Sequence, residues 1–79
     1  MLDDITPDEI LDCRGLHCPM PILKTKKTIA RMKSGEILEI QSTDLGTKND
    51  LPSFASRAGH EYVGDRDEEC FVRSYIKVK

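Results

Sequence analysis

Residues 10–21 read Ile-Leu-Asp-Cys-Arg-Gly-Leu-His-Cys-Pro-Met-Pro and predict a short strand followed directly by a helix. Cys18 precedes a proline, which keeps its backbone out of the α region, as in a residue that caps a helix N-terminus. Pro19 and Pro21 then fall in the first helical turn, where a missing N–H costs no hydrogen bond. The stretch therefore predicts a helix over residues 19–33 with a cysteine at its N-terminus.

The rest of the chain continues with alternating strand and helix patterns. Residues 36–42 alternate apolar and polar side chains, as a half-buried strand does. Residues 50–58 have apolar side chains at i, i+3, i+4 and i+7, as an amphipathic helix does. Pro52 is expected in the first turn of this second helix, which makes Asn49 or Asp50 its N-cap. A charged turn over residues 64–69 separates the last two strands. The predicted elements are strand 10–13, helix 19–33, strand 36–42, helix 50–58, and strands 60–63 and 70–78.

This order predicts one α/β domain over residues 1–79. It is a β-α-β-α-β-β two-layer sandwich, with two helices on one face of a four-stranded mixed sheet. A right-handed crossover makes the first two strands parallel, so that their carboxyl ends share one edge of the sheet. Chemistry in such folds favours that edge. We therefore expect the loop carrying Cys18 and the loop carrying Asp44 to be neighbours.

The composition is that of an ordinary globular chain with a net charge of −2. No stretch approaches the roughly 20 apolar residues that a spanning helix needs. The acidic N-terminus is not a signal peptide, and the three cysteines are an odd number for a disulfide framework. These features predict a protein of a reducing compartment, the cytoplasm.

The position of Cys18 favours reactivity of its thiol. A helix N-terminus carries about half a positive charge, which stabilises a thiolate. The Met20 N–H faces this position, and His17, Arg14 and Lys24 add positive charge nearby in the sequence. Serine, threonine or aspartate would cap the helix better, so capping alone explains a cysteine poorly. A thiolate is the form that accepts and donates sulfur.

Residues 11–21 resemble the signature of the TusA (SirA-like) sulfurtransferase family, a Leu-Asp-x-x-Gly-Leu stretch followed by Cys-Pro-x-Pro. The resemblance extends over residues 10–79, although Cys13 and Leu45 stand where the family commonly has a small residue and a proline. It implies a fold related to the C-terminal domain of bacterial translation initiation factor three. The residues that would support Cys18 in this motif are Asp12, Arg14, Gly15, Pro19, Met20, Pro21 and Asp44.

The resemblance also implies an activity and partners. Cys18 would hold a persulfide sulfur received from a cysteine desulfurase or a rhodanese-like protein. An acceptor protein would then take the sulfur, for example towards tRNA thiolation or sulfur oxidation. The alternative class is a non-catalytic module on the same fold, redox-sensing or nucleic-acid-binding, which would not need a thiolate at a helix mouth.

Other polar and sulfur-containing residues have two interpretations each. Cys13 is a small core residue or a resolving thiol for Cys18, and Cys70 belongs to the core or to a strand edge. Asp12 and Asp44 either tie their loops or form a carboxylate pair for proton transfer. The first interpretation is favoured for both aspartates.

Residues 14–33 carry six bases and no acid, although the chain as a whole is slightly acidic. This asymmetry predicts that Lys24, Lys27 and Arg31 dock an acidic protein partner, the alternative being a solvated face. We do not expect direct nucleic-acid binding, because aromatic residues do not interleave the bases. We expect no cofactor or metal, because the chain lacks Cys-x-x-Cys, His-x-x-x-His and a glycine-rich phosphate loop.

Overall fold

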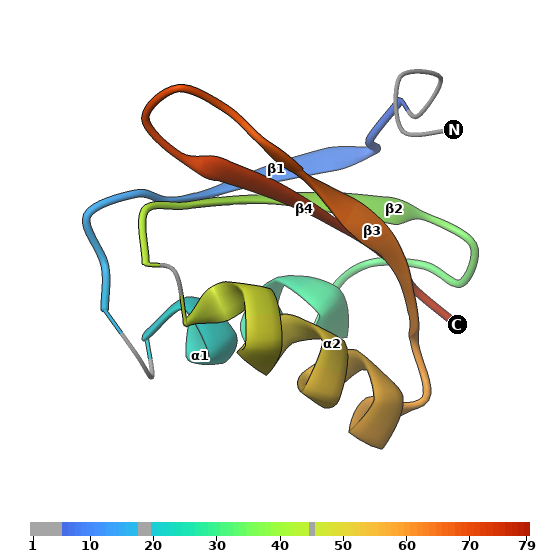
Figure 1. Cartoon of the computed structure of the whole chain (residues 1–79). Helices are drawn as coiled ribbons and strands as arrows, with labels where there is room; N and C mark the ends of the chain where they lie inside the picture. Colours follow the sequence, from blue (N-terminus) through green and yellow to red (C-terminus); the bar gives the residue numbers. More distant parts are fainter. Residues whose placement is uncertain (1–5, 18–19, 45) are drawn as a thin grey trace.

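The structure is a computed structural model that describes residues 6–17, 20–44 and 46–79. Two helices cover one face of a four-stranded sheet (Figure 1). The predicted element order and two-layer α/β architecture are confirmed. The elements are β1 (Glu9–Cys13), α1 (Met20–Ala30), β2 (Ile37–Ser42), α2 (Thr47–Ala58), β3 (Glu61–Asp67) and β4 (Val72–Lys77).

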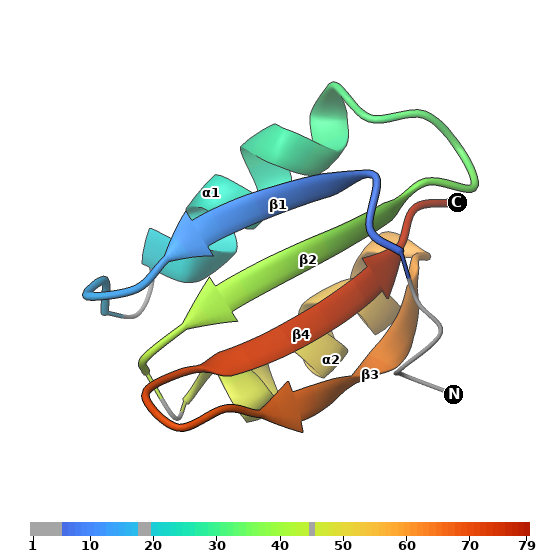
Figure 2. The ribbon, with the colours of Figure 1, turned by 90° about the horizontal axis from the view of Figure 1, so that it is seen from above.

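The strands lie in the order β1-β2-β4-β3, as Figure 2 shows. β1 and β2 are parallel, as predicted, and the pairs β2–β4 and β3–β4 are antiparallel. One edge of the sheet therefore gathers the segments 14–17, 43–44 and 68–71, which we call the carboxyl edge. β1 begins and β4 ends at the opposite edge (Figure 2).

The core lies between the sheet and the helices. Leu11 pairs with Ile40, and Leu38 pairs with Ile76, so that alternate residues of three strands point toward the helices. This alternation is the one predicted for the strand 36–42. Aliphatic side chains from both helices complete the layer. The fully or nearly fully buried members of the cluster are Cys13, Ile29, Leu38, Ile40, Leu51, Ala55, Ile76 and Val78.

The helix-free face of the sheet is less open than its polar side chains predict. Glu39 and Tyr75 point away from the helices, yet only 2% and 4% of their surfaces are exposed. Gln41 Nε2 donates a hydrogen bond of 2.7 Å to Glu39 Oε2, which satisfies part of the buried carboxylate. Burial raises the pKa of Tyr75. Neighbouring side chains thus shield this face at its centre.

α1 ends at Ala30, earlier than the predicted residue 33. The buried side of the helix includes Thr25 and Thr28, whose hydroxyls donate to the backbone carbonyls four residues earlier at 2.7 and 2.9 Å. A hydroxyl that donates a hydrogen bond to a carbonyl of its own helix can lie in a core without other partners. Leu23 instead faces solvent and is 45% exposed. The core-facing side of α1 therefore contains threonines as well as apolar residues.

α2 begins at Thr47, not at the predicted residue 50. The Asp44 carboxylate accepts the Gly46 N–H at 2.9 Å, and the Asp44 carbonyl accepts the Thr47 hydroxyl at 2.7 Å. These bonds start the helix one turn earlier. Pro52 is consequently the sixth residue of α2, and the prediction that it lies in the first turn is wrong. The carbonyl of Lys48 loses its helical donor there.

The β3–β4 hairpin also differs from its prediction. β3 continues to Asp67, because a register shift between Tyr62 and Gly64 lets the strand pass through the segment predicted as a turn. The connection moves to residues 68–71, so Cys70 lies in the hairpin turn. Cys70 is exposed there, and its assignment to the core or a strand edge is wrong.

Candidate active site at the carboxyl edge

Cys18 and Pro19 lie outside the described residues, as does Leu45, so the site is built from its flanks. Before the gap, Leu16 N–H donates to the Cys13 carbonyl at 3.1 Å. After it, Met20 N–H donates to the His17 carbonyl at 2.8 Å, so the prediction that this N–H is the donor facing the Cys18 sulfur is wrong. Backbone hydrogen bonds thus fix both flanks at the carboxyl edge. That Cys18 caps α1 stays a prediction.

Met20 and Pro21 are the first two residues of α1, which confirms their place in its first turn. Pro21 is buried, whereas Met20 is 42% exposed. Buried Pro21 anchors the helix start against the core, and the missing N–H leaves no intrahelical bond unmade at this position. An apolar side chain therefore faces solvent beside the segment that carries Cys18.

A hydrogen bond joins the two loops at this edge. Gly15 N–H donates to Thr43 Oγ1 at 2.9 Å. Gly15 has φ +81°, in the left-handed region that other residues adopt at a cost. The Asp44 carboxylate, one residue further on, accepts the Gly46 N–H. The expectation that these loops are neighbours is confirmed, and Asp44 ties its own loop as predicted.

Asp12 is engaged by Arg14. The Asp12 carboxylate accepts bonds from Arg14 N, Nε and Nη2 at 3.0, 3.0 and 3.2 Å. These bonds lower the pKa of Asp12 and raise that of Arg14. A carboxyl held ionised in this way is a poor proton donor near neutral pH. The arrangement fits a loop tie, the interpretation favoured from the sequence.

Phe71 connects the β3–β4 hairpin to this loop, which the sequence reasoning missed. The guanidinium carbon of Arg14 lies 5.5 Å from the Phe71 ring centroid, and that of Arg73 lies 5.3 Å from it. Cation–π contacts of this kind are each worth about 0.5–1 kcal/mol when exposed. The only local signal was the alternation of Phe71 and Arg73, since Arg14 is far away in sequence.

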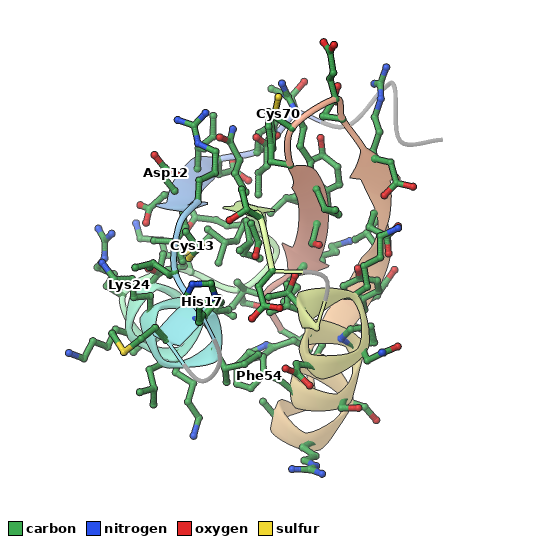
Figure 3. The ribbon with its side chains drawn as sticks, turned by 60° about the vertical axis from the view of Figure 1, so that its left-hand side comes forward. Asp12, Cys13, His17, Lys24, Phe54 and Cys70 are labelled. Atoms are coloured by element: carbon green, nitrogen blue, oxygen red, sulfur yellow. The ribbon has the colours of Figure 1, made fainter. Side chains whose placement is uncertain are left out.

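The two described cysteines occupy opposite environments. Cys13 has no exposed surface and lies in the core between the sheet and α1 (Figure 3). Burial raises the pKa of the Cys13 thiol, which keeps it protonated and unreactive. The assignment of Cys13 to the core is confirmed. Cys70 lies at the hairpin turn, well away from Cys13 in Figure 3.

Positive charge reaches the carboxyl edge from α1. The first turn of this helix contains no acid. The bonds from Arg14 are the main cause of the lowered pKa of Asp12, and the Lys24 ammonium adds to it; burial raises the pKa of Cys13, and Lys24 opposes that rise. Lys27 is exposed, whereas Arg31 Nη2 forms an ion pair of 2.7 Å with Glu9 Oε2.

The described residues contain neither a candidate metal cluster nor a candidate membrane-spanning helix. No group of three histidine, cysteine, aspartate or glutamate side chains among residues 6–17, 20–44 and 46–79 could hold a metal ion. Within the same ranges, no helix combines the length and apolar character required to cross a membrane.

Comparison with protein families matches residues 9–78 to the family described as Sulfurtransferase TusA. This chain belongs to the TusA sulfurtransferase family. The matched range confirms the resemblance drawn from residues 10–79 and makes the chain a relative of sulfur-carrier proteins.

Individual relatives agree with this assignment. The sulfur carrier protein TusA of Allochromatium vinosum is 43% identical over 61 residues, which cover 77% of this chain and 80% of that protein. The sulfur carrier protein TusA of Pseudomonas putida strain W619 is 36% identical over 78 residues, covering 99% and 98%. YrkF of Bacillus subtilis is 47% identical over 68 residues, covering 86% of this chain and only 37% of YrkF. The chain thus spans little more than a third of YrkF.

A solved structure supports the fold. A SirA-like protein from Desulfitobacterium hafniense superposes with a TM-score of 0.72 and 21% identity, covering 87% of this chain and 95% of that one.

Proposed function

We propose that this TusA-family chain is a sulfurtransferase that holds sulfane sulfur as a persulfide on Cys18. The donor is a cysteine desulfurase or a rhodanese-like protein, and the acceptor is a second sulfur-relay protein, for example one feeding tRNA thiolation or sulfur oxidation. The reaction belongs in a reducing compartment such as the cytoplasm, where thiols persist.

Transfer requires two displacements at sulfur. The Cys18 thiolate attacks the terminal sulfur of the donor persulfide, the donor S–S bond breaks, and the donor cysteine leaves as a thiolate. The acceptor thiolate then attacks the terminal sulfur held on Cys18, and Cys18 leaves as a thiolate. Sulfur moves without net oxidation or reduction, so neither a metal nor a redox cofactor is needed.

The observation that carries the proposal is the electrostatic setting of the flanks of Cys18. The segment leads into α1, a helix whose first turn has no acid, and the Lys24 charge acts on the neighbouring β1 terminus. Both features favour a thiolate as attacking and as leaving group. The Asp12–Arg14 ion pair and the Gly15–Thr43 hydrogen bond stabilise the loop segment that immediately precedes Cys18.

Partner docking is proposed at the exposed side of α1, through Lys24, Lys27 and Arg31. Two proteins must bring two cysteines together, so the surface nearest to Cys18 is covered in the encounter. Arg31 already pairs with Glu9, which leaves Lys24 and Lys27 as the residues whose reversal tests this surface. Charges of this kind mainly raise the association rate.

The test is intact mass after incubation with a cysteine desulfurase and cysteine. We expect added sulfur on the wild type, on Cys13→Ala and on Cys70→Ser, and none on Cys18→Ser. Sulfur that stays on Cys18→Ser after removal of free polysulfide would contradict the proposal and favour a non-catalytic module on this fold.

A further inference from the structure

A groove of about 540 Å³ separates α1 from α2 on the side away from the sheet. Its apolar floor is formed by Ile22 and Phe54, both packed against the core. Phe54 lies between the two helices in Figure 3. The tilted ring of His60 lies 6.3 Å from the Phe54 ring centroid. The floor is thus continuous with the core of the fold.

The groove leads to the carboxyl edge. α1 and α2 follow β1 and β2, whose carboxyl ends share that edge, and both helices begin there (Figure 1). Ile22 and Asp50 lie in the first turns of their helices, and Arg57 lies in the last turn of α2. A segment bound along the groove therefore has one end beside the loop that carries Cys18.

The walls of the groove carry two cations from different helices, Lys26 on α1 and Arg57 on α2. Neither forms an ion pair with any residue that the structure describes, whereas Arg31 and Lys48 do. The single acid of the groove, Asp50, lies in the first turn of α2, where the positive helix terminus balances it. The groove is therefore apolar below and cationic at its walls.

We propose that this groove binds an acidic segment of the partner protein that places an apolar side chain on the floor between Lys26 and Arg57. Carboxylates of the bound segment pair with the two cations, Lys26 and Arg57, and its apolar side chain covers Ile22 and Phe54. The inference rests on the proposed function, because a segment seated here brings its protein to Cys18. The groove would be a second contact with the partner, beside the proposed Lys24–Lys27–Arg31 face and formed by other residues.

The test uses a fluorescein-labelled decapeptide in which leucine and phenylalanine alternate with glutamate. Its affinity for the full chain is measured by anisotropy at about 50 and 150 mM salt. The groove variant is Lys26→Glu with Arg57→Glu. The matched control is Lys33→Glu with Lys77→Glu, which makes the same change in net charge at two exposed positions outside the groove. Thermal unfolding of both double variants checks that the four substitutions leave the fold intact.

We expect the groove variant to lose about tenfold or more in affinity and the control to lose about twofold or less. Amide NMR shifts on peptide addition should centre on Ser53, Phe54 and Arg57. Equal losses in both double variants, shifts centred on Lys24 and Lys27, or no binding to the wild type would each overturn the proposal. Self-association without peptide, abolished in the groove variant, would make a second copy the occupant and overturn it as well.

Cys18→Ser separates this inference from the proposed function, because peptide binding needs no thiol. Binding that persists in Cys18→Ser supports the groove irrespective of whether Cys18 takes up sulfur. A wild type that takes up sulfur but does not bind the peptide overturns the groove and leaves the carrier role of Cys18 standing.

Discussion

Replacement of Cys13 tests whether this thiol serves packing or chemistry. Its side chain is fully buried among aliphatic residues, so Cys13→Ala leaves a small cavity that costs about 1 kcal/mol. Cys13→Ser buries a hydroxyl instead, at a cost of about 2 kcal/mol. In a domain of this size each kcal/mol lowers Tm by about 4–8 °C. We expect the serine variant to melt about 8–16 °C below the wild type, and the alanine variant to lie between them.

The pH dependence of stability gives a second readout of Cys13. Burial raises the pKa of its thiol above the ordinary value of 9.0, so the folded state holds the proton more tightly than the unfolded chain. The resulting stability is complete below pH 9.0 and is lost as the pH rises above it. Urea unfolding between pH 8 and about 9.5 measures this, before the tyrosines ionise, and Cys13→Ala should remove the slope.

The combined result decides between packing and chemistry. Both variants should accept sulfur at the wild-type rate at a temperature where they are folded. A serine variant as stable as the wild type that transfers sulfur slowly would refute the packing argument and make Cys13 a working thiol.

One measurement on the wild type and three variants test the site and the fold. The Cys18 thiol should alkylate with a midpoint below that of free cysteine under the same conditions, and a midpoint at or above it would mean that the flanking charges do not activate the sulfur. Lys24→Glu with Lys27→Glu should slow transfer from a protein donor at low salt without altering Tm, and an unchanged rate would remove this face from the docking model. Pro52→Ala should raise the free energy of unfolding by about 1 kcal/mol by restoring a helical bond, as denaturant titration would report, and a loss would show that the proline ring fits α2 without strain. Gly59→Ala should lower the free energy of unfolding by about 1 kcal/mol, because Gly59 caps α2 with φ +82°. An unchanged free energy of unfolding would mean that the cap relaxes.

The sheet and its inward face were predictable from the sequence because strand alternation has a short, strict period. Leu38 and Ile40 alternate with charged or amide side chains, and a shift by one residue would turn the buried set to the other face. The meeting of the two loops at the carboxyl edge followed from the handedness of the crossover. These inferences need only neighbours in sequence and a general rule of topology.

The remaining features depend on the particular partner that each residue finds, whether near or far along the chain. The start of α2 is set by the hydrogen bonds that Asp44 accepts from Gly46 and Thr47, which no apolar period reveals. The exposure of Cys70 follows from the register shift near Gly64, and the stack of Arg14 on Phe71 joins β1 to the hairpin. The burial of Thr25 required its hydroxyl to find a carbonyl in its own helix. The periodicity of a sequence predicts which face of a helix or strand a residue lies on. It does not predict which hydrogen-bond or ring partner that residue contacts.

The path of the chain has a practical meaning for anything attached to it. β1 begins and β4 ends at the edge opposite the loop that leads to Cys18, so polypeptide joined beyond these two strands starts from the far edge of the sheet. A carrier of this shape can be anchored by its ends and still present its loop to successive partners. The match to only 37% of YrkF gives a natural counterpart, in which a homologous stretch is joined to further polypeptide. Immobilisation through either terminus is accordingly the attachment best suited to surface-based measurements of partner exchange.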